Sequence, residues 1–340
     1  MTETVRLSLD EVHRLAMAAF TNNGTSEPQA RAVADTVTAA ERDECTSHGL
    51  FRIPGYLAAV KSGKVNPKAS PEVTQLAPAV IKVDADGGFA PLALERGRAP
   101  LVELAKAQGI AAQAIVNSYH FAALWPEVEA LADEGLVGFA YVAAMKYVAP
   151  AGGTKPLYGT NPMAFAWPRP GRSPLAFDQA SSASARGEIM LHQRDGHALP
   201  DGWAIDAQGQ ATNDPSAALA GAQLAFGGYK GASIALMVEL MAGALVGDLF
   251  SFEASEADNG DGGPPRGGEF LIAIDPARCV SDRGRDAQLA HAEGLFTEIL
   301  AQPGTRLPSD RRYEARQRTP TDGVTVPRAL HDTIVELGGG

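Results

Sequence analysis

Short apolar runs alternate with helix-like segments from about residue 72 onward, and this alternation constrains the fold more than any other feature. Residues 79–83, 110–116 and 137–143 have the composition of strands, and residues 90–107 and 122–134 between them have that of helices. Strands alternating with helices are typical of an α/β core. The sequence therefore predicts an α/β fold, with further short strands at residues 164–167, 175–177 and 270–274.

Two capping signals predict helices before this region. Ser8 with Glu11, and Ser26 with Gln29, have the spacing of a capping box, and each pair precedes apolar residues at helical intervals. A short helix is expected after Pro54. Later helices are expected at residues 183–194, from Lys230, at residues 286–302 and after Pro327.

Glycine, proline and charge mark the less regular parts of the chain. Residues 195–228 are expected to be rich in loops, residues 253–268 to form a flexible surface loop, and the tail from Thr305 to be irregular. The apolar stretch 232–249 contains Glu239, so it predicts a buried core helix rather than a membrane span. We expect three parts: a helical subdomain at 1–72, an α/β catalytic and cofactor-binding core at 73–302, and an arginine-rich segment with a helix at 303–340 that packs back on the first part.

The overall charge excludes one class of partner. Lysine and arginine total 29 against 40 aspartate and glutamate residues, which gives a formal charge of −11 at pH 7. A nucleic-acid backbone requires a basic surface, so we expect no nucleic-acid partner. The two cysteines, Cys45 and Cys279, are too few for a disulfide framework. With no apolar leader and no membrane segment, the sequence predicts a cytoplasmic protein.

Common nucleotide, nucleophile and metal motifs are missing from the sequence. No G-x-G-x-x-G follows a strand, and residues 227–231 contain a lysine without the Walker spacing. No G-x-S-x-G motif occurs. No pair of histidines or cysteines has the spacing of metal ligands, so we expect no metal site.

A histidine and an arginine four residues apart form the strongest candidate for chemistry. They are His48 and Arg52, in the run Ser-His-Gly-Leu-Phe-Arg that begins at Ser47. One helical turn would place both side chains on one face. Histidine donates protons near neutral pH, and the arginine fork suits a carboxylate. The alternative interpretation is a histidine at a helix end with a surface arginine.

Polar turns at strand ends form the next candidates. Residues 117–121 follow a strand and are expected to open a helix, whose free N–H groups would suit phosphate. Residues 158–162 and 177–182 join strands to small polar side chains, and ordinary turn chemistry is the alternative. Arg186, Gly187 and Glu188 begin a helix, where Glu188 could simply favour the helix dipole.

Three arginines within seven residues stand out in so acidic a chain. Arg306, Arg311 and Arg312 could hold a phosphate group, such as the 2′-phosphate of NADP. A solvated basic turn is the alternative interpretation.

Taken in order, these segments resemble the malate/L-sulfolactate dehydrogenase family of NAD(P)H-dependent oxidoreductases, from about residue 5 to 335. That family has no Rossmann fingerprint. The resemblance therefore implies a non-Rossmann, mixed-sheet NAD(P)-binding core flanked by helical subdomains. It depends on residues 47–52, 159–162, 227–231, 238–240 and 306–308.

Within the family, residues 118–125 and 310–313 are most similar to the Δ1-piperideine-2-carboxylate/Δ1-pyrroline-2-carboxylate reductase branch. Four residues depart from that branch, and one of them stands where a glycine is usual. They are Gln179, Arg186, Tyr229 and, in place of the glycine, Ser309.

The resemblance implies a role for each motif. His48 would donate the proton, and Ser47 and Glu188 would flank it as a relay. Arg52 would clamp the substrate carboxylate, in a pocket also lined by Thr160, Arg186 and Gly187. Four segments would hold the nucleotide: His120, Phe121, Ala122, Ala123 and Leu124; Asp178, Gln179 and Ala180; Tyr229 and Lys230; and Arg306, Leu307, Pro308, Ser309, Asp310, Arg311 and Arg312.

The implied reaction is the NADPH-dependent reduction of two cyclic imines, Δ1-piperideine-2-carboxylate and Δ1-pyrroline-2-carboxylate, to L-pipecolate and L-proline. The resemblance also implies a homodimer, and NADH is the alternative cofactor. A 2-hydroxy-acid dehydrogenase acting on malate, lactate, sulfolactate or ureidoglycolate is the alternative enzyme, because His48 and Arg52 would serve a keto acid equally well. A non-catalytic binding protein would need no proton donor. The sequence leaves open the preferred ring size and the pathway, whether lysine catabolism or proline metabolism.

Overall fold

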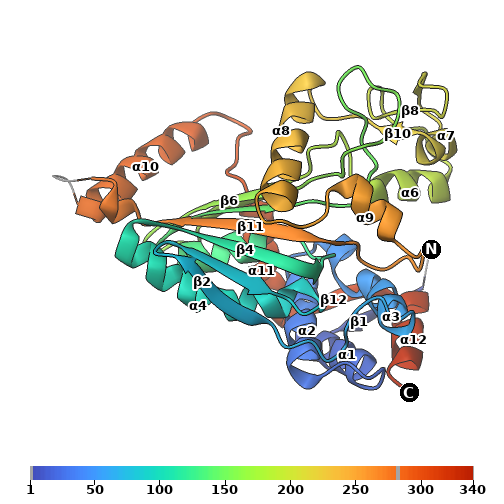
Figure 1. Ribbon diagram of the computed structural model, residues 1–340, viewed down its shortest axis with the longest axis horizontal. Helices are drawn as coiled ribbons and strands as arrows, with labels where there is room; N and C mark the ends of the chain where they lie inside the picture. Colours follow the sequence, from blue (N-terminus) through green and yellow to red (C-terminus); the bar gives the residue numbers. More distant parts are fainter. Residues whose placement is uncertain (1–2, 281–283, 340) are drawn as a thin grey trace.

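A seven-stranded sheet lies at the centre of the computed structural model, which describes residues 3–280 and 284–339 (Figure 1). Among the described strands of this sheet, only the second and third along the chain run parallel to each other, and the other pairs are antiparallel. The sheet is therefore mixed, and the predicted mixed-sheet α/β core is confirmed. Its strands lie in the order β2 (Glu72–Ala77), β3 (Val80–Asp84), β4 (Ile110–Tyr119), β11 (Arg266–Ile274), β5 (Val137–Val142), β6 (Met163–Trp167) and β7 (Leu175–Gln179).

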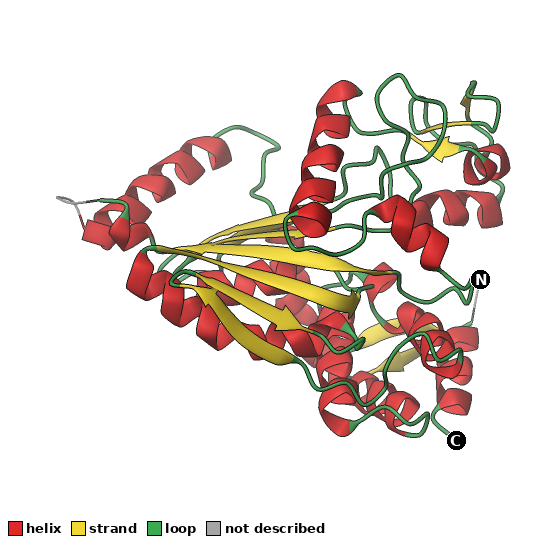
Figure 2. Cartoon of the chain, in the orientation of Figure 1, coloured by secondary structure: helices red, strands yellow, loops and turns green. Residues whose placement is uncertain are grey.

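Successive residues of each strand point to opposite faces of this sheet. On one face, Leu271 and Ala273 of β11 join the main core beneath α4 (Ala90–Gln108) and α5 (Trp125–Asp133). On the other face, Phe270 packs against α8 (Tyr229–Glu239) and the π turn Leu240–Ala244 that continues it. Figure 2 shows these helices above and below the strands.

A second core lies in the N-terminal helices and includes the end of the chain. It contains α1 (Leu9–Thr21), α2 (Glu27–Arg42), α3 (Ile53–Lys61) and α12 (Arg328–Leu337). Two short strands close it, because β1 (Thr4–Leu7) pairs antiparallel with β12 (Val324–Pro327). The sequence analysis predicted neither β1 nor β2.

One of the two predicted capping boxes is confirmed. The Ser8 hydroxyl accepts a hydrogen bond from Glu11 N at 3.2 Å, and Glu11 accepts one from Ser8 N at 2.8 Å. The box at Ser26 is wrong, because Ser26 makes no side-chain cap and Gln29 is fully buried. The Gln29 amide instead donates to Asn66 O at 3.0 Å and accepts from Phe89 N at 2.8 Å.

Two other expectations about irregular segments need correction. The predicted flexible loop at 253–268 is partly regular, since α9 (Ser251–Ala257) and β11 occupy its two ends. The middle is held by Lys64, whose ammonium group lies 2.8 Å from Asp258 and 2.5 Å from Asp261. The predicted irregular tail contains α11 (Asp310–Asp322). The prediction that residues 195–228 are rich in loops is confirmed, and the loops connect the short elements α7 (Pro215–Ala220), β8 (Ala204–Ile205), β9 (Ala211–Thr212) and β10 (Ala222–Gln223).

The prediction that the helix at 232–249 is buried in the core is also wrong. Val238 is buried on the sheet, but Leu236 and Leu240 on the opposite side are exposed. Among the described residues, no helix is both long and apolar enough to cross a membrane. The helices predicted at 183–194, at 286–302 and after Pro327 are confirmed as α6 (Arg186–Asp195), α10 (Gly284–Leu300) and α12. Figure 1 shows α10 projecting away from the sheet.

Candidate active site

The predicted histidine and arginine lie in two short 3-10 turns between α2 and α3. The turns are Thr46–His48 and Leu50–Arg52, so the predicted single helical turn is interrupted at Gly49. The Ser47 hydroxyl lies 3.0 Å from His48 Nδ1, and Arg52 Nε donates to the Ser47 carbonyl at 2.7 Å. The structure therefore brings Ser47, His48 and Arg52 together.

A buried carboxyl group fixes the shape of this loop. Glu41 of α2 accepts a hydrogen bond from Leu50 N at 2.8 Å. Its Oε1 also occupies the space beside Gly49, where a Cβ atom would lie only 2.1 Å away. Burial raises the pKa of Glu41 to about 7. Glycine is needed here for its small size, and the sequence analysis did not identify Glu41.

The surroundings of His48 keep its imidazole neutral in the free protein. Burial is the main cause, and electrostatic interaction with Arg52 and then with His120 adds to it, so that the pKa of His48 falls to about 4. A bound carboxylate would neutralise part of the Arg52 charge and raise that pKa. The proton affinity of His48 is therefore coupled to the occupancy of the position beside Arg52.

Aromatic rings surround the Arg52 guanidinium. Its central carbon lies 4.8 Å from the ring centre of Phe121 and 5.7 Å from that of Phe51. Burial lowers the pKa of Arg52, and Tyr147 is close enough to affect it. The Arg186 guanidinium lies 4.0 Å from the Tyr147 ring centre. Tyr147, which the sequence analysis missed, thus links two predicted substrate-binding arginines.

The turn that contains Thr160 is held from behind by Glu239 of α8. Glu239 accepts hydrogen bonds from Gly159 N at 3.2 Å and from the Asn161 amide at 2.8 Å. The Thr160 carbonyl accepts from Ser181 N at 2.7 Å. Thr160 therefore lies on a rigid turn, and the predicted turn residues are fixed by a buried acid from a distant helix.

Glu188 and Gly187 lie in the first turn of α6. The Glu188 carboxylate is half exposed and lies 3.8 Å from His192 Nε2, one helical turn further on. A Cβ atom at Gly187 would meet only open space. Of the three residues in the predicted relay, Ser47 and His48 are in contact. Among the described contacts, none joins Glu188 to either of them. The role of Glu188 stays a prediction.

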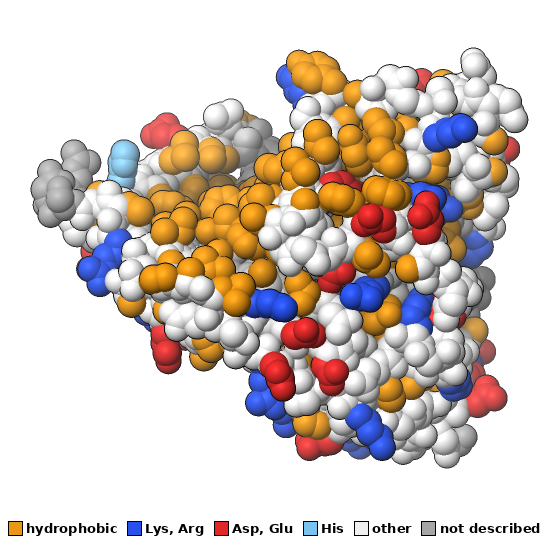
Figure 3. Space-filling model, in the orientation of Figure 1, with side chains coloured by type: hydrophobic (Ala, Val, Ile, Leu, Met, Phe, Trp, Pro, Cys, Tyr) orange, Lys and Arg blue, Asp and Glu red, His pale blue; other side chains and the backbone are white. Residues whose placement is uncertain are grey.

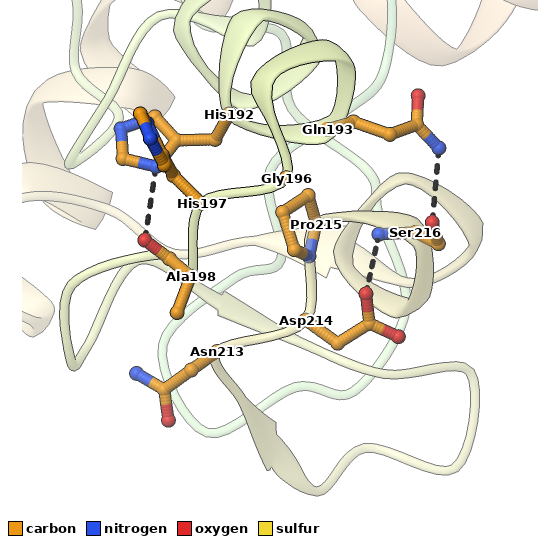
Figure 4. Close-up of a pocket in the computed structure, with 9 residues that line it drawn as sticks. All are labelled: His192, Gln193, Gly196, His197, Ala198, Asn213, Asp214, Pro215 and Ser216. Atoms are coloured by element: carbon orange, nitrogen blue, oxygen red, sulfur yellow. Dashed lines mark hydrogen bonds between the residues drawn. The ribbon is translucent and has the colours of Figure 1, made fainter.

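A separate cavity of about 440 Å³ lies at the far end of α6 (Figure 4). His192 Nδ1 lies 2.9 Å from the Ala198 carbonyl, and Ser216 N donates to Asp214 at 3.0 Å. None of the residues that line this cavity belongs to the predicted site. They are His192, Gln193, Gly196, His197, Ala198, Asn213, Asp214, Pro215 and Ser216.

Two predicted cofactor segments meet at the start of α5. The expectation that residues 117–121 open a helix is wrong, because β4 continues to Tyr119 and α5 begins at Trp125. The Asp178 carboxylate of β7 accepts hydrogen bonds from Leu124 N, at 3.0 Å, and from Trp125 N. These helix N–H groups are therefore already used by a carboxylate and are not free for a phosphate.

The predicted cofactor segment 306–312 also contacts the start of α5, through Arg312. Its guanidinium lies 4.7 Å from the Trp125 ring centre and 3.2 Å from Glu129 of α5. It also donates to Ser309 at 2.8 Å. Ser309 has φ of +78°, so it adopts the left-handed conformation that favours glycine. Arg312 is thus part of the protein framework.

Arg306 and Arg311 differ from Arg312, because both are exposed and make no ion pair with any described residue. Tyr229 and Lys230, at the start of α8, are exposed as well. The segment that carries Tyr229 and Lys230 is connected to the predicted cofactor segment 178–180 through Phe226. The N–H of Phe226 donates to the carbonyl of Ser181, next to that segment, at 3.1 Å. No three His, Cys, Asp or Glu side chains of the described residues gather as metal ligands would.

Comparison with known proteins identifies the family. The family model described as malate/L-lactate dehydrogenase matches residues 7–335. The chain is 52% identical over 333 residues to the Delta(1)-pyrroline-2-carboxylate/Delta(1)-piperideine-2-carboxylate reductase of Pseudomonas aeruginosa, covering 98% of this chain and 99% of that protein.

Solved structures agree over similar lengths. The delta1-piperideine-2-carboxylate reductase from Pseudomonas syringae pvar. tomato aligns with a TM-score of 0.93 at 41% identity, over 98% of this chain and 100% of that chain. The sulfolactate dehydrogenase from Methanocaldococcus jannaschii aligns with a TM-score of 0.88 at 26% identity, over 98% and 97%. With the whole catalytic region inside the match, the chain belongs to the malate/L-lactate dehydrogenase family.

Proposed function

We propose that this protein is an oxidoreductase that reduces Δ1-pyrroline-2-carboxylate and Δ1-piperideine-2-carboxylate to L-proline and L-pipecolate with a nicotinamide cofactor. The observation that carries the proposal is the pairing of His48 with Arg52 in one loop, where a proton donor lies beside a carboxylate clamp. The full-length similarity to reductases of these imines supplies the substrate class.

Arg52 orients the substrate in this proposal. Its guanidinium binds the carboxylate, which fixes the imine carbon and nitrogen relative to His48. The partly buried Phe121 ring beside Arg52 suits the apolar ring carbons, and the centre of the more exposed Phe51 ring lies 5.7 Å from the guanidinium carbon. Arg186, stacked on Tyr147, supplies a second positive charge on the same side. Thr160 lies on the turn that Glu239 holds.

His48 supplies the proton to the imine nitrogen. The free protein keeps its imidazole neutral, but the substrate carboxylate on Arg52 raises the pKa of His48. Protonation is thus favoured when substrate is bound. Ser47 holds the Nδ1 side of the ring, so Nε2 is the atom that faces the substrate. When bound, the dihydronicotinamide supplies the hydride that the imine carbon receives.

NADPH is the proposed cofactor, and two unpaired guanidinium groups support it. Arg306 and Arg311 are exposed and free of carboxylate partners among the described residues, so they suit a 2′-phosphate. Replacing both with Gln should raise KM for NADPH and leave KM for NADH unchanged. An equal effect on both cofactors would assign the two arginines to another role.

We also propose that the protein is a homodimer. The exposed face of α8 and its π turn carries Tyr229, Leu236, Leu240 and Leu245, which are 68%, 45%, 49% and 59% exposed. Figure 3 shows hydrophobic side chains gathered along α8 and across the neighbouring face of the sheet. A surface this apolar is unusual for a monomer and suits a second copy of the chain.

The test of the proposed function is oxidation of NADPH by purified protein with four substrates in parallel: the two cyclic imines, pyruvate and oxaloacetate. Turnover of the imines with little turnover of the keto acids is the expected result. Turnover of a keto acid alone would make the protein a 2-hydroxy-acid dehydrogenase. The variant H48A should lower kcat by roughly 10²–10⁴-fold, the usual range for loss of a general acid.

A further inference from the structure

Glu269 is a buried acid outside the predicted site. It lies on β11 between Ile115 of β4 and Val142 of β5, in the middle of the sheet. Its exposure is 1%, and neither carboxyl oxygen has a hydrogen-bond donor among the described residues. An ionised carboxylate in such a place is costly without a partner, so the neutral acid is the favoured form.

The group nearest to this acid is a second unpaired side chain. His120, in the loop after β4, has its Nε2 atom 3.9 Å from Oε2 of Glu269, and its side chain is 8% exposed. Nε2 has no hydrogen-bond partner among the described residues. A small movement would bring the two atoms within the usual hydrogen-bond distance of about 3 Å. A carboxylic acid O–H and a neutral imidazole nitrogen are matched donor and acceptor.

The pair lies between the proposed proton donor and the helix-covered side of the sheet. On one side, a charge on His120 would be close enough to His48 to lower its pKa. On the other side, Glu127 of α5 interacts electrostatically with Glu269, and Arg98 of α4 interacts with Glu127. A small cavity lined by Arg98, Gln113 and Glu127 adjoins this end. Each of these titratable groups is therefore within electrostatic range of the next, from His48 to Arg98.

We propose that Glu269 stores the proton that imine reduction consumes and passes it through His120 to His48. The inference rests on the proposed function. In each turnover, His48 loses its N–H proton to the ring nitrogen. His120 then gives a proton to His48 and receives the O–H proton of Glu269 on Nε2. The Glu269 carboxylate regains a proton from solvent through Glu127, so one proton enters for each product formed.

On the pKa values of the two groups, the transfer from Glu269 to His120 is uphill, so it has to be coupled to protonation of the basic ring nitrogen at the end of the path. Burial, and then the charge of Glu127, raise the pKa of Glu269 well above its usual range, which favours the protonated acid. Burial lowers the pKa of His120 to about 4, which keeps its imidazole neutral with one ring nitrogen unprotonated, so it carries a proton only in passing. Glu127, with its pKa raised by burial to about 7, can exchange protons with solvent near neutrality.

The first test is the variant E269Q, which keeps the shape and a donor N–H but cannot release a proton. We expect kcat for imine reduction to fall by about 10²-fold, within the range for general acids, with KM for NADPH unchanged. The solvent isotope effect on kcat should rise, because proton delivery becomes limiting. E134Q, a change at the exposed Lys106–Glu134 pair, is the matched control and should behave as wild type. Wild-type kcat in E269Q would overturn the proposal.

A second readout does not depend on activity. Infrared spectra at pH 8.5 should show the carbonyl band of a protonated carboxylic acid in the wild type and not in E269Q. This pH lies above the pKa of about 7 of Glu41 and of Glu127, so both are largely ionised there. Identical spectra would overturn the proposal. If the wild type reduces no imine, the proposed function fails, while the infrared result still decides whether Glu269 stores a proton.

If E269Q does not fold, E269D takes its place. Aspartate keeps the acid but withdraws it from His120 by about one methylene group. A folded E269D with lowered kcat supports the transfer from Glu269, and a folded E269D with wild-type kcat overturns it.

Discussion

At the scale of single residues, the catalytic loop depends on close packing between Gly49 and Glu41. G49A would place a methyl group 2.1 Å from Glu41 Oε1, a contact that forces the loop to move. We expect G49A to lower the free energy of unfolding by about 1–3 kcal/mol and to reduce kcat through displacement of His48. Chemical denaturation and imine turnover measure the two effects.

The matched control for G49A is G294A, on the exposed face of α10. A Cβ atom there meets nothing within 4 Å, so alanine should raise stability by up to about 1 kcal/mol through its better helix propensity. A G49A protein as stable and active as wild type would show that Glu41 does not fix the loop.

The protonation of Glu41 gives a second prediction at this scale. Its folded pKa of about 7 lies above the unfolded value of 4.5, so the folded state binds more protons between these pH values. The contribution of Glu41 to stability is present below pH 4.5 and is lost as pH rises to about 7, by roughly 2–3 kcal/mol. E41Q, which keeps the acceptor for Leu50 N, should lack this part of the pH dependence. Denaturation of both proteins from pH 4.5 to 8 measures it, and parallel curves would contradict it.

Sequence analysis found the site residues that are close in the chain and missed those that are distant. His48 and Arg52 were identified because their spacing and chemistry are local. Glu41, Tyr147 and Glu239 were missed because each reaches the site only through tertiary packing. Glu239 stands out in the sequence as a charge in the apolar stretch 232–249, but no local pattern shows that it holds the Thr160 turn.

At the scale of elements, α11 is stabilised by ion pairs more than by an apolar face. Arg316 donates from Nε to Asp43 at 2.9 Å and from Nη2 to Glu129 at 3.0 Å, which ties α11 to α2 and α5. The Asp43 side chain is fully buried, and the hydrogen bonds from Arg316 and Arg42 hold its pKa below its usual value despite that burial. This explains why the sequence predicted an irregular tail, since only Ala315 and Thr319 of α11 are buried.

R316A tests that account. Removing the Arg316 guanidinium leaves the buried Asp43 carboxylate with fewer hydrogen bonds and less positive charge beside it. We therefore expect a loss of about 3 kcal/mol in the free energy of unfolding. R318A, on the same helix, breaks only an exposed pair with Glu44 and should cost much less. Thermal and chemical denaturation of the two variants measure the difference, and equal losses would contradict the buried-pair explanation.

The elements that sequence analysis missed lack the expected hydrophobic pattern. All six residues of β2 are exposed, so this strand has no apolar face, and β1 is only four residues long. The helices with a capping box or an apolar stripe were predicted correctly, because those signals are local. The pairing of β1 with β12 is a long-range contact that no local pattern specifies.

At the scale of the whole molecule, the proposed dimer depends on the exposed face of α8. L236E should place a charge in an apolar interface and shift the protein from dimer to monomer. Sedimentation or light scattering at several concentrations measures the mass. A329E, on the exposed surface of α12, is the control and should leave the mass unchanged. A monomeric wild type, or a dimeric L236E, would contradict the proposed surface.

The strand pair β1–β12 also bears on when the enzyme first becomes active during synthesis. Leu50 and Ile53, beneath the catalytic loop, share one core with Val324, Val326 and Ile334. A ribosome makes these last three residues long after it has made the loop. In a nascent chain, the core beneath Ser47, His48 and Arg52 therefore stays incomplete until translation is nearly finished. We expect activity only once the last residues have packed into that core.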